Sequence, residues 1–218
     1  AELLPEEAEA LGLLALVLYA ESRRSARRGA SGDFVPLDAQ DPLAWDIAAI
    51  AEAEALLRRA CALGTIGRYQ LEAALQSAHA ARRRSGRADW PAVVALYDAL
   101  FALTRSPVVQ INRALAIAET QGTDAAIAAL PDVDTDERLR RYQPYWAARA
   151  ELLARNGANG QAHEAFELAI GLARDDAIRR FLQRRQAALA VARPRDGSGG
   201  VVADAASAVC RAPFCGRG

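Results

Sequence analysis

The sequence predicts an all-α protein built from stacked antiparallel helical hairpins, and two observations lead to this fold class. Apolar residues recur at helical spacing through most of the chain, which is the pattern of an amphipathic helix. Turn glycines stand at Gly86, Gly122 and Gly157, about 35 residues apart, a period typical of tetratricopeptide-type hairpins. Such a hairpin cannot bury its apolar face alone, so we expect the hairpins to stack into a short right-handed solenoid.

Three parts of the chain can be distinguished from the sequence. Residues 1–66 should form an N-terminal helical pair joined by a structured loop, 29–41. Residues 67–190 should form the tetratricopeptide-like repeats. The remainder, 191–218, is rich in small residues and has no periodicity, so we expect a disordered or loosely packed tail.

In the N-terminal pair, the first helix opens at Pro5 and has apolar residues on nearly all sides, which predicts deep burial. Its end carries four arginines: Arg23, Arg24, Arg27 and Arg28. We interpret this end as solvated, since basic residues suit a helix C-terminus. Asp41 and Pro42 predict the start of the second helix. An Asp side chain accepts hydrogen bonds from the unpaired amides of the first turn, and proline suits the first helical position. Trp45 then falls on the first turn, in an apolar stripe that predicts a buried indole.

The repeat region divides into three hairpins and a terminal helix. The hairpins are expected at 69–84 with 90–103, at 107–122 with a short helix ending at Pro131, and at 146–157 with 162–169. The terminal helix, 175–190, carries another four arginines: Arg179, Arg180, Arg184 and Arg185. We interpret its charged side as the solvent-facing surface that a capping helix needs.

Composition excludes several classes of protein. Of the 218 residues, 52% are hydrophobic and 25% charged, as in a globular protein with a substantial core. The 27 basic and 27 acidic residues give a net charge of +0, so the chain lacks the positive field of a free-standing nucleic-acid-binding protein. The longest apolar run, 10–20, is shorter than the roughly 20 residues of a membrane helix, and we expect a cytoplasmic protein. Because the chain contains no Met, we also expect further residues upstream of it.

No motif for catalysis or metal binding stands out. His79 and His163 lie inside helical patterns, without a nucleophile elbow, a phosphate loop or an HExxH sequence. The three cysteines, Cys61, Cys210 and Cys215, are too few for a four-ligand zinc site. We therefore expect a protein that is not an enzyme and that has no cofactor or metal ion.

The segment 31–46 is the stretch whose residues suit a helix least. It reads S-G-D-F-V-P-L-D-A-Q-D-P-L-A-W-D. The helix start and the buried indole explain its second half, whereas 32–36 and Gln40 have no such explanation, so we expect a contact surface in its first ten residues. Its four aspartates are an alternative site for a divalent cation, although they lack the alternating spacing of a calcium loop.

Several blocks resemble one known family. They are R-R-S-A-R at 23–27, G-D-F-V-P-L-D-A-Q-D-P-L-A-W-D at 32–46 and R-Y-Q-L-E-A-A-L-Q-S-A-H-A at 68–80, followed by D-W-P-A-V-V-A-L-Y-D-A-L, S-P-V-V-Q-I-N-R-A-L-A, R-A-E-L-L-A-R-N-G and R-R-F-L-Q-R-R. In this order they resemble the tetratricopeptide-like C-terminal extension of extracytoplasmic-function sigma factors, which are bacterial initiation factors of RNA polymerase. The likeness covers residues 5–190. At Pro42 and Ala39 the chain departs from the family, which usually has Arg and often Asp at these positions.

The resemblance implies a regulatory or protein-interaction domain that modulates transcription initiation. Its partners would be RNA polymerase, the protein's own sigma regions or a regulatory protein, and DNA would be bound only through the sigma regions, which this chain lacks. The residues implied in contacts are Asp33, Phe34, Leu37, Gln40, Asp41, Trp45, Asp46, Asn112 and Arg113. For Asn112, a buried bridge between helices is an equal alternative. The alternative function is a free-standing tetratricopeptide-type scaffold that binds peptides and is unrelated to transcription.

Overall fold

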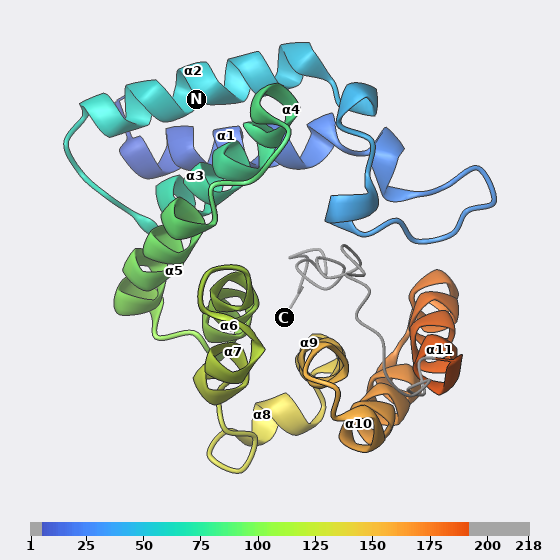
Figure 1. The fold of residues 1–218 in the computed structure, drawn as a ribbon. Coiled ribbons are helices and arrows are strands. Elements are labelled where there is room, and N and C mark those ends of the chain that lie inside the picture. Colours follow the sequence, from blue (N-terminus) through green and yellow to red (C-terminus); the bar gives the residue numbers. More distant parts are fainter. Residues whose placement is uncertain (1–5, 192–218) are drawn as a thin grey trace.

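The computed structural model describes residues 6–191, and the regular elements in that part of the chain are helices (Figure 1). The all-α class is therefore confirmed. None of the described helices combines the length and the apolar character that crossing a membrane would require. The tail expected at 191–218, with Cys210 and Cys215, lies outside the described residues except for Val191, which ends the last helix.

The N-terminal unit contains three helices, α1 (Ala8–Ser22), α2 (Ile47–Ala62) and α3 (Arg68–Ala80). Helix α1 packs against both α2 and α3. The core of this unit includes Leu11 and Tyr19 of α1 together with Trp45. The expected burial of α1 on nearly all sides is wrong for one face, because Leu13 and Val17 are exposed. The reason is that both of its packing partners lie on the other side of the helix, and the described residues bring no third element over this face.

The rest of the described chain is a succession of helices. They are α4 (Arg82–Ser85), α5 (Trp90–Thr104), α6 (Pro107–Gln121), α7 (Thr123–Ala129), α8 (Glu137–Arg140), α9 (Gln143–Arg155), α10 (Asn159–Leu172) and α11 (Asp176–Val191). Local sequence sets these bounds: Asp89 accepts a bond from the amide of Ala92 at the start of α5, and Gly86, Gly122 and Gly157 take positive φ in the turns.

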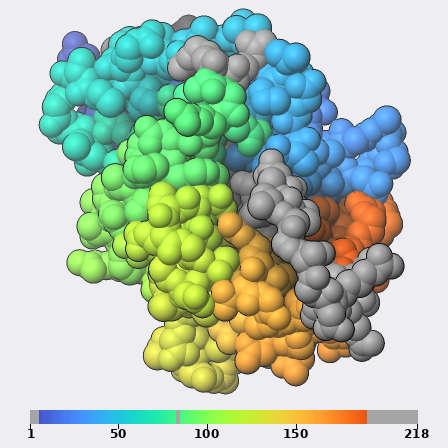
Figure 2. Space-filling view, in the orientation of Figure 1, coloured from blue at the N-terminus to red at the C-terminus, as the bar shows by residue number. Residues whose placement is uncertain are grey.

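Apart from the short α8, the helices from α5 to α11 pack mainly on the next long helix along the chain. Figure 1 shows that this succession curves round, so that α11 returns to the loop between α1 and α2. In the space-filling view, the end of the coloured chain lies directly beside this loop (Figure 2). Residues about 147 positions apart thereby become neighbours.

The loop between α1 and α2 contains three short 3-10 turns: η1 (Ser25–Arg27), η2 (Leu37–Ala39) and η3 (Pro42–Ala44). The expected start of the second helix at Asp41 is wrong. Asp41 and Pro42 begin η3, and α2 begins five residues later, at Ile47. The physical reason is Trp45, which is only 3% exposed and has extended backbone angles, φ −83° and ψ 141°, that a helix does not permit.

Candidate interaction site

Trp45 fixes the loop to the helical core. Its indole lies among Tyr19 of α1, Leu37 of η2 and other buried apolar side chains. Two guanidinium groups lie over it, with the Cζ atoms of Arg23 and Arg82 at 6.0 and 5.8 Å from the ring centroid. Arg82 also donates to the carbonyl of Leu37 at 2.8 Å, and burial lowers the pKa of Arg82 below its ordinary value. The aromatic anchor and the chain around it are thus held from α1 and from α4.

The middle of the loop is held by its own backbone. The amide of Val35 donates to the carbonyl of Arg27 at 3.0 Å, and Arg28 and Phe34 form an antiparallel bridge. Gln40 is buried and donates from Nε2 to the carbonyl of Val35 at 3.1 Å. Gln40 therefore positions the chain at Val35, so the structure gives it a local role that the sequence did not reveal.

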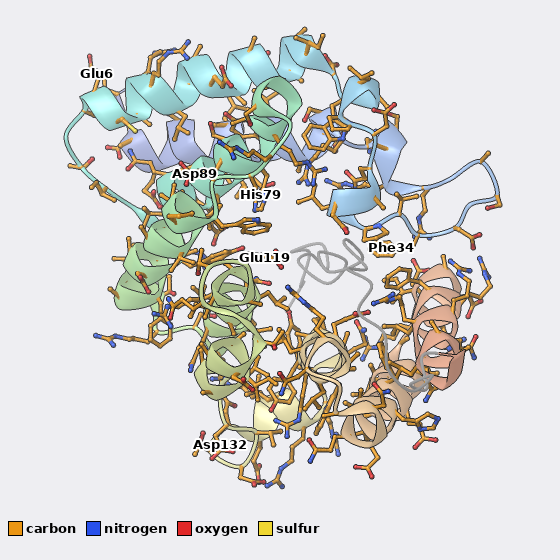
Figure 3. The ribbon with its side chains drawn as sticks, viewed as in Figure 1. Glu6, Phe34, His79, Asp89, Glu119 and Asp132 are labelled. Atoms are coloured by element: carbon orange, nitrogen blue, oxygen red, sulfur yellow. The ribbon has the colours of Figure 1, made fainter. Side chains whose placement is uncertain are left out.

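The tip of the loop contacts α11 through charges and through aromatic rings. Arg28 Nη2 lies 2.5 Å from Asp175 Oδ2, and Asp33 Oδ1 lies 3.4 Å from Arg180 Nε. The Phe34 ring meets Phe181 edge to face, with centroids 5.5 Å apart and an interplanar angle of 75°. Figure 3 labels Phe34 on the loop, directed toward α11. Arg184 completes the group, at 3.7 Å from Asp33.

We call this group the clasp. It consists of three residues of the loop and four at or within α11: Arg28, Asp33 and Phe34, with Asp175, Arg180, Phe181 and Arg184. Its charged side chains are each more than a third exposed, so the clasp forms at the molecular surface.

The charges of the clasp remain paired at neutral pH. The hydrogen bond from Arg28 lowers the pKa of Asp175 to about 2, and the amides of Ala177 and Ile178 add to this effect. The pKa of Asp33 is also lowered, first by the hydroxyl of Ser31 and then by the cations of α11. Asp175 has a second task, because its Oδ1 accepts the first free amides of α11.

The interpretation of the arginine-rich helix ends as solvated surfaces is wrong in part. Arg23 is buried and donates to Gln76 Oε1 at 2.6 Å, and Arg28 belongs to the clasp. In α11, Arg185 makes a bidentate pair with the buried Glu151 at 2.7 and 2.6 Å, which raises the pKa of Arg185. These cations join elements that are distant in sequence, which helical periodicity cannot indicate.

The four aspartates of the loop do not converge on one point. Asp41 Oδ1 accepts from the amide of Leu43 in η3, and Asp46 Oδ1 accepts from Ala48 and Ala49 at the start of α2. Asp33 faces α11. Within residues 6–191, no group of three or more His, Cys, Asp or Glu side chains is placed to hold a metal ion. The cation alternative therefore has no geometry to support it in this part of the chain.

Asn112 and Arg113 lie on α6, which Figure 1 places away from the loop. Arg113 Nε bonds to Asp98 Oδ1 and so ties α6 to α5, and Asn112 is half-buried. Of the residues predicted from sequence, Leu37, Gln40 and Trp45 are thus gathered in the loop's anchor, and Asp33 and Phe34 in the clasp. Sequence reasoning missed Asp175 and Phe181. In the sequence, their contacts with 28–34 could be suspected only because both segments carry opposite charges and an aromatic residue.

Comparison with known proteins adds three findings. Residues 1–61 match a family of unknown function, DUF6596, and this match spans α1, the loop and nearly all of α2. An uncharacterized protein of Rhizobium meliloti (strain 1021) is 40% identical over 171 residues, which is 78% of this chain. The chain spans 40% of the length of that relative. No solved structure matches the chain significantly.

Proposed function

We propose that this chain is a non-catalytic regulatory domain of an extracytoplasmic-function sigma factor, which acts by contacting RNA polymerase, the sigma regions or a partner protein. The sequence resemblance supports this proposal, as does similarity to a relative more than twice as long as the aligned segment. The observation that carries it is the anchored loop. Next to the buried Trp45, the large apolar side chains of Leu43 and Ile47 are 75% and 57% exposed.

A rigid loop with exposed apolar side chains is suited to docking. Buried Trp45, the cap at Asp46 and the bond from the Asp46 amide to the carbonyl of Ser22 fix the backbone between Leu43 and Ile47. Because this order already exists in the free domain, binding costs less conformational entropy than it would for a flexible loop. The loop is thereby a preformed contact surface.

We further propose that α3–α11 form a tetratricopeptide-like solenoid. Contacts across one period support this arrangement: Arg155 pairs with Glu119 at 2.8 Å, 36 residues away, and Arg185 pairs with Glu151, 34 residues away. Small and aromatic residues at the repeat positions, such as Ala162 and Phe166, are fully buried. Both pairs join helices that stand about one repeat length apart, which is the kind of contact that one-dimensional repeat packing requires.

The test is transcription by the full-length factor with the double substitution Leu43→Ser and Ile47→Ser. We expect transcription to fall several-fold, because the loop loses its exposed apolar contacts while the core residues remain. The matched control is Leu63→Ser with Ile66→Ser, which removes two exposed apolar side chains near the other end of α2. Circular dichroism and urea unfolding check that both variants stay folded.

Two outcomes would count against the proposal. If both variants transcribe like the unchanged protein, the exposed side chains of Leu43 and Ile47 are not a contact surface. If the full-length protein neither binds RNA polymerase nor supports transcription, the free-standing peptide-binding scaffold becomes the better description.

A further inference from the structure

The tip of the loop is covered by the protein itself. The contact surface expected at 32–36 includes Asp33 and Phe34, and both side chains are engaged by α11. The face of α11 that contacts the loop carries a cation, an aromatic ring and a second cation: Arg180, Phe181 and Arg184. This face is complementary to an acidic residue followed by an aromatic one.

We propose that α11 is a built-in competitor for this surface, and that the loop's protein partner presents a similar basic and aromatic helix face. The proposal rests on the proposed function in one respect, that the loop binds another protein. A partner can occupy Asp33 and Phe34 only after α11 has left, so the clasp lowers the partner's apparent affinity by the fraction of molecules that are closed.

The clasp is suited to reversible opening. Its ion pairs are exposed, and exposed pairs are individually weak and are screened by salt. Its aromatic contact is one edge-to-face pair at the rim, whereas Phe166 and Leu182 form the buried contacts that hold α11 on α10. Breaking the clasp therefore exposes little apolar surface.

The loop tip keeps its shape when the clasp is open. The amide of Gly29 donates to the carbonyl of Asp33 at 2.9 Å, and the amide of Gly32 donates to that of Gly29 at 2.8 Å. The anchor at Trp45 lies in a separate cluster that contains no residue of α11. An open molecule thus presents a folded binding surface for a partner.

The first test opens the clasp from the α11 side with Arg180→Glu and Arg184→Glu, in the full chain, and follows amide hydrogen exchange by mass spectrometry. We expect exchange across 28–36 to become several-fold faster, because the loop's own backbone hydrogen bonds open transiently more often once α11 no longer packs against them. Exchange in α1–α3 should remain unchanged. Adding Asp33→Arg restores opposite charges and should slow the exchange again. The control Arg58→Glu with Arg87→Glu makes the same change in charge at exposed positions outside the clasp. Exchange equal to that of the control would overturn the proposal.

The second test supplies the proposed partner chemistry in trans. A labelled peptide of residues 174–189 stands in for a basic and aromatic partner helix, and its binding is measured by fluorescence anisotropy. We expect it to bind the Arg180→Glu, Arg184→Glu protein at least tenfold more tightly than the unchanged protein. The same peptide with Phe181→Ala and both arginines changed to Glu should not bind. If the peptide binds the Arg180→Glu, Arg184→Glu protein and the unchanged protein equally, or binds neither, the proposal that α11 competes for the loop is overturned.

The two tests need no RNA polymerase, so their failure is distinct from failure of the proposed function. One combined outcome separates them: the Leu43→Ser, Ile47→Ser variant loses transcription, while Arg180→Glu with Arg184→Glu leaves amide exchange at 28–36 unchanged. This outcome would support the regulatory domain and contradict the proposal that α11 competes for the loop.

Discussion

At Gly12 the backbones of α1 and α3 lie close together. A Cβ atom at this position would lie 2.7 Å from the backbone nitrogen of Gln70, and a backbone atom inside a packed helix cannot move aside cheaply. We expect Gly12→Ala to lower the free energy of unfolding by about 1–3 kcal/mol, measured by urea denaturation. An unchanged midpoint would mean that the two helices are less closely packed than described.

Gly160, on α10, provides the matched control. A Cβ atom there meets nothing within 4 Å, and alanine is the better helix former. Gly160→Ala should therefore leave the free energy of unfolding the same or raise it by up to about 1 kcal/mol.

Asp175 gives a prediction about pH. Its folded-state pKa of about 2 lies below the ordinary value, so its contribution to stability is present above about pH 4 and is lost as the pH falls toward 2. The exposed pair is screened by solvent, so this contribution is small. In an NMR titration of the carboxyl carbon, Arg28→Ala should raise the pKa of Asp175, but not fully to the ordinary value, because the amides of α11 still donate to it. A pKa that Arg28→Ala leaves unchanged would contradict the pairing.

Among the elements, α2 depends most clearly on one cap. Asp46 Oδ1 accepts two amides at its start, at 2.9 and 3.1 Å. We expect Asp46→Ala to lower the free energy of unfolding by about 1 kcal/mol, and Asp46→Asn by less, since Asn retains an accepting oxygen. Asp41→Ala should cost less than Asp46→Ala in the same urea measurement, because Asp41 caps only the three residues of η3. The reverse order would place the true helix start at Asp41.

The same contrast explains what could be predicted of the elements. The bounds of α6, α9 and α11 follow from local apolar spacing and turn residues, and sequence reasoning found them to within a few residues. The start of α2 could not be found this way, because Asp41 and Asp46 are both good caps. Burial of Trp45, a tertiary contact, decides between them.

At the scale of the whole molecule, the clasp closes a ring of helices. We expect Arg28→Glu, which brings a negative charge against Asp175, to increase the radius of gyration measured by small-angle X-ray scattering, because α11 separates from the loop. Arg24→Glu is the matched control, since Arg24 pairs only with its helical neighbour Glu21 among the described contacts. Equal radii for the two variants would mean that ring closure does not depend on the Arg28 pair.

The ring is also where prediction from sequence ends. Repeats of about 35 residues indicate which helices pack in succession, but not how far the succession curves. The pairing of Asp33 with Arg180 and of Phe34 with Phe181 joins positions far apart in one sequence, and neither local propensity nor periodicity carries information about such a pair. For that reason the residue types of 31–46 indicate a segment that is not a helix, but they do not indicate which helix contacts it.

Ring closure also has a consequence in time. The loop leaves the ribosome well before α11, which is about 147 residues further along the chain. At synthesis rates of about 5–20 residues per second, the Asp33 and Phe34 surface remains uncovered for on the order of ten seconds on every nascent chain. During that interval the N-terminal unit offers this surface to any early-binding protein, and completion of α11 ends the opportunity.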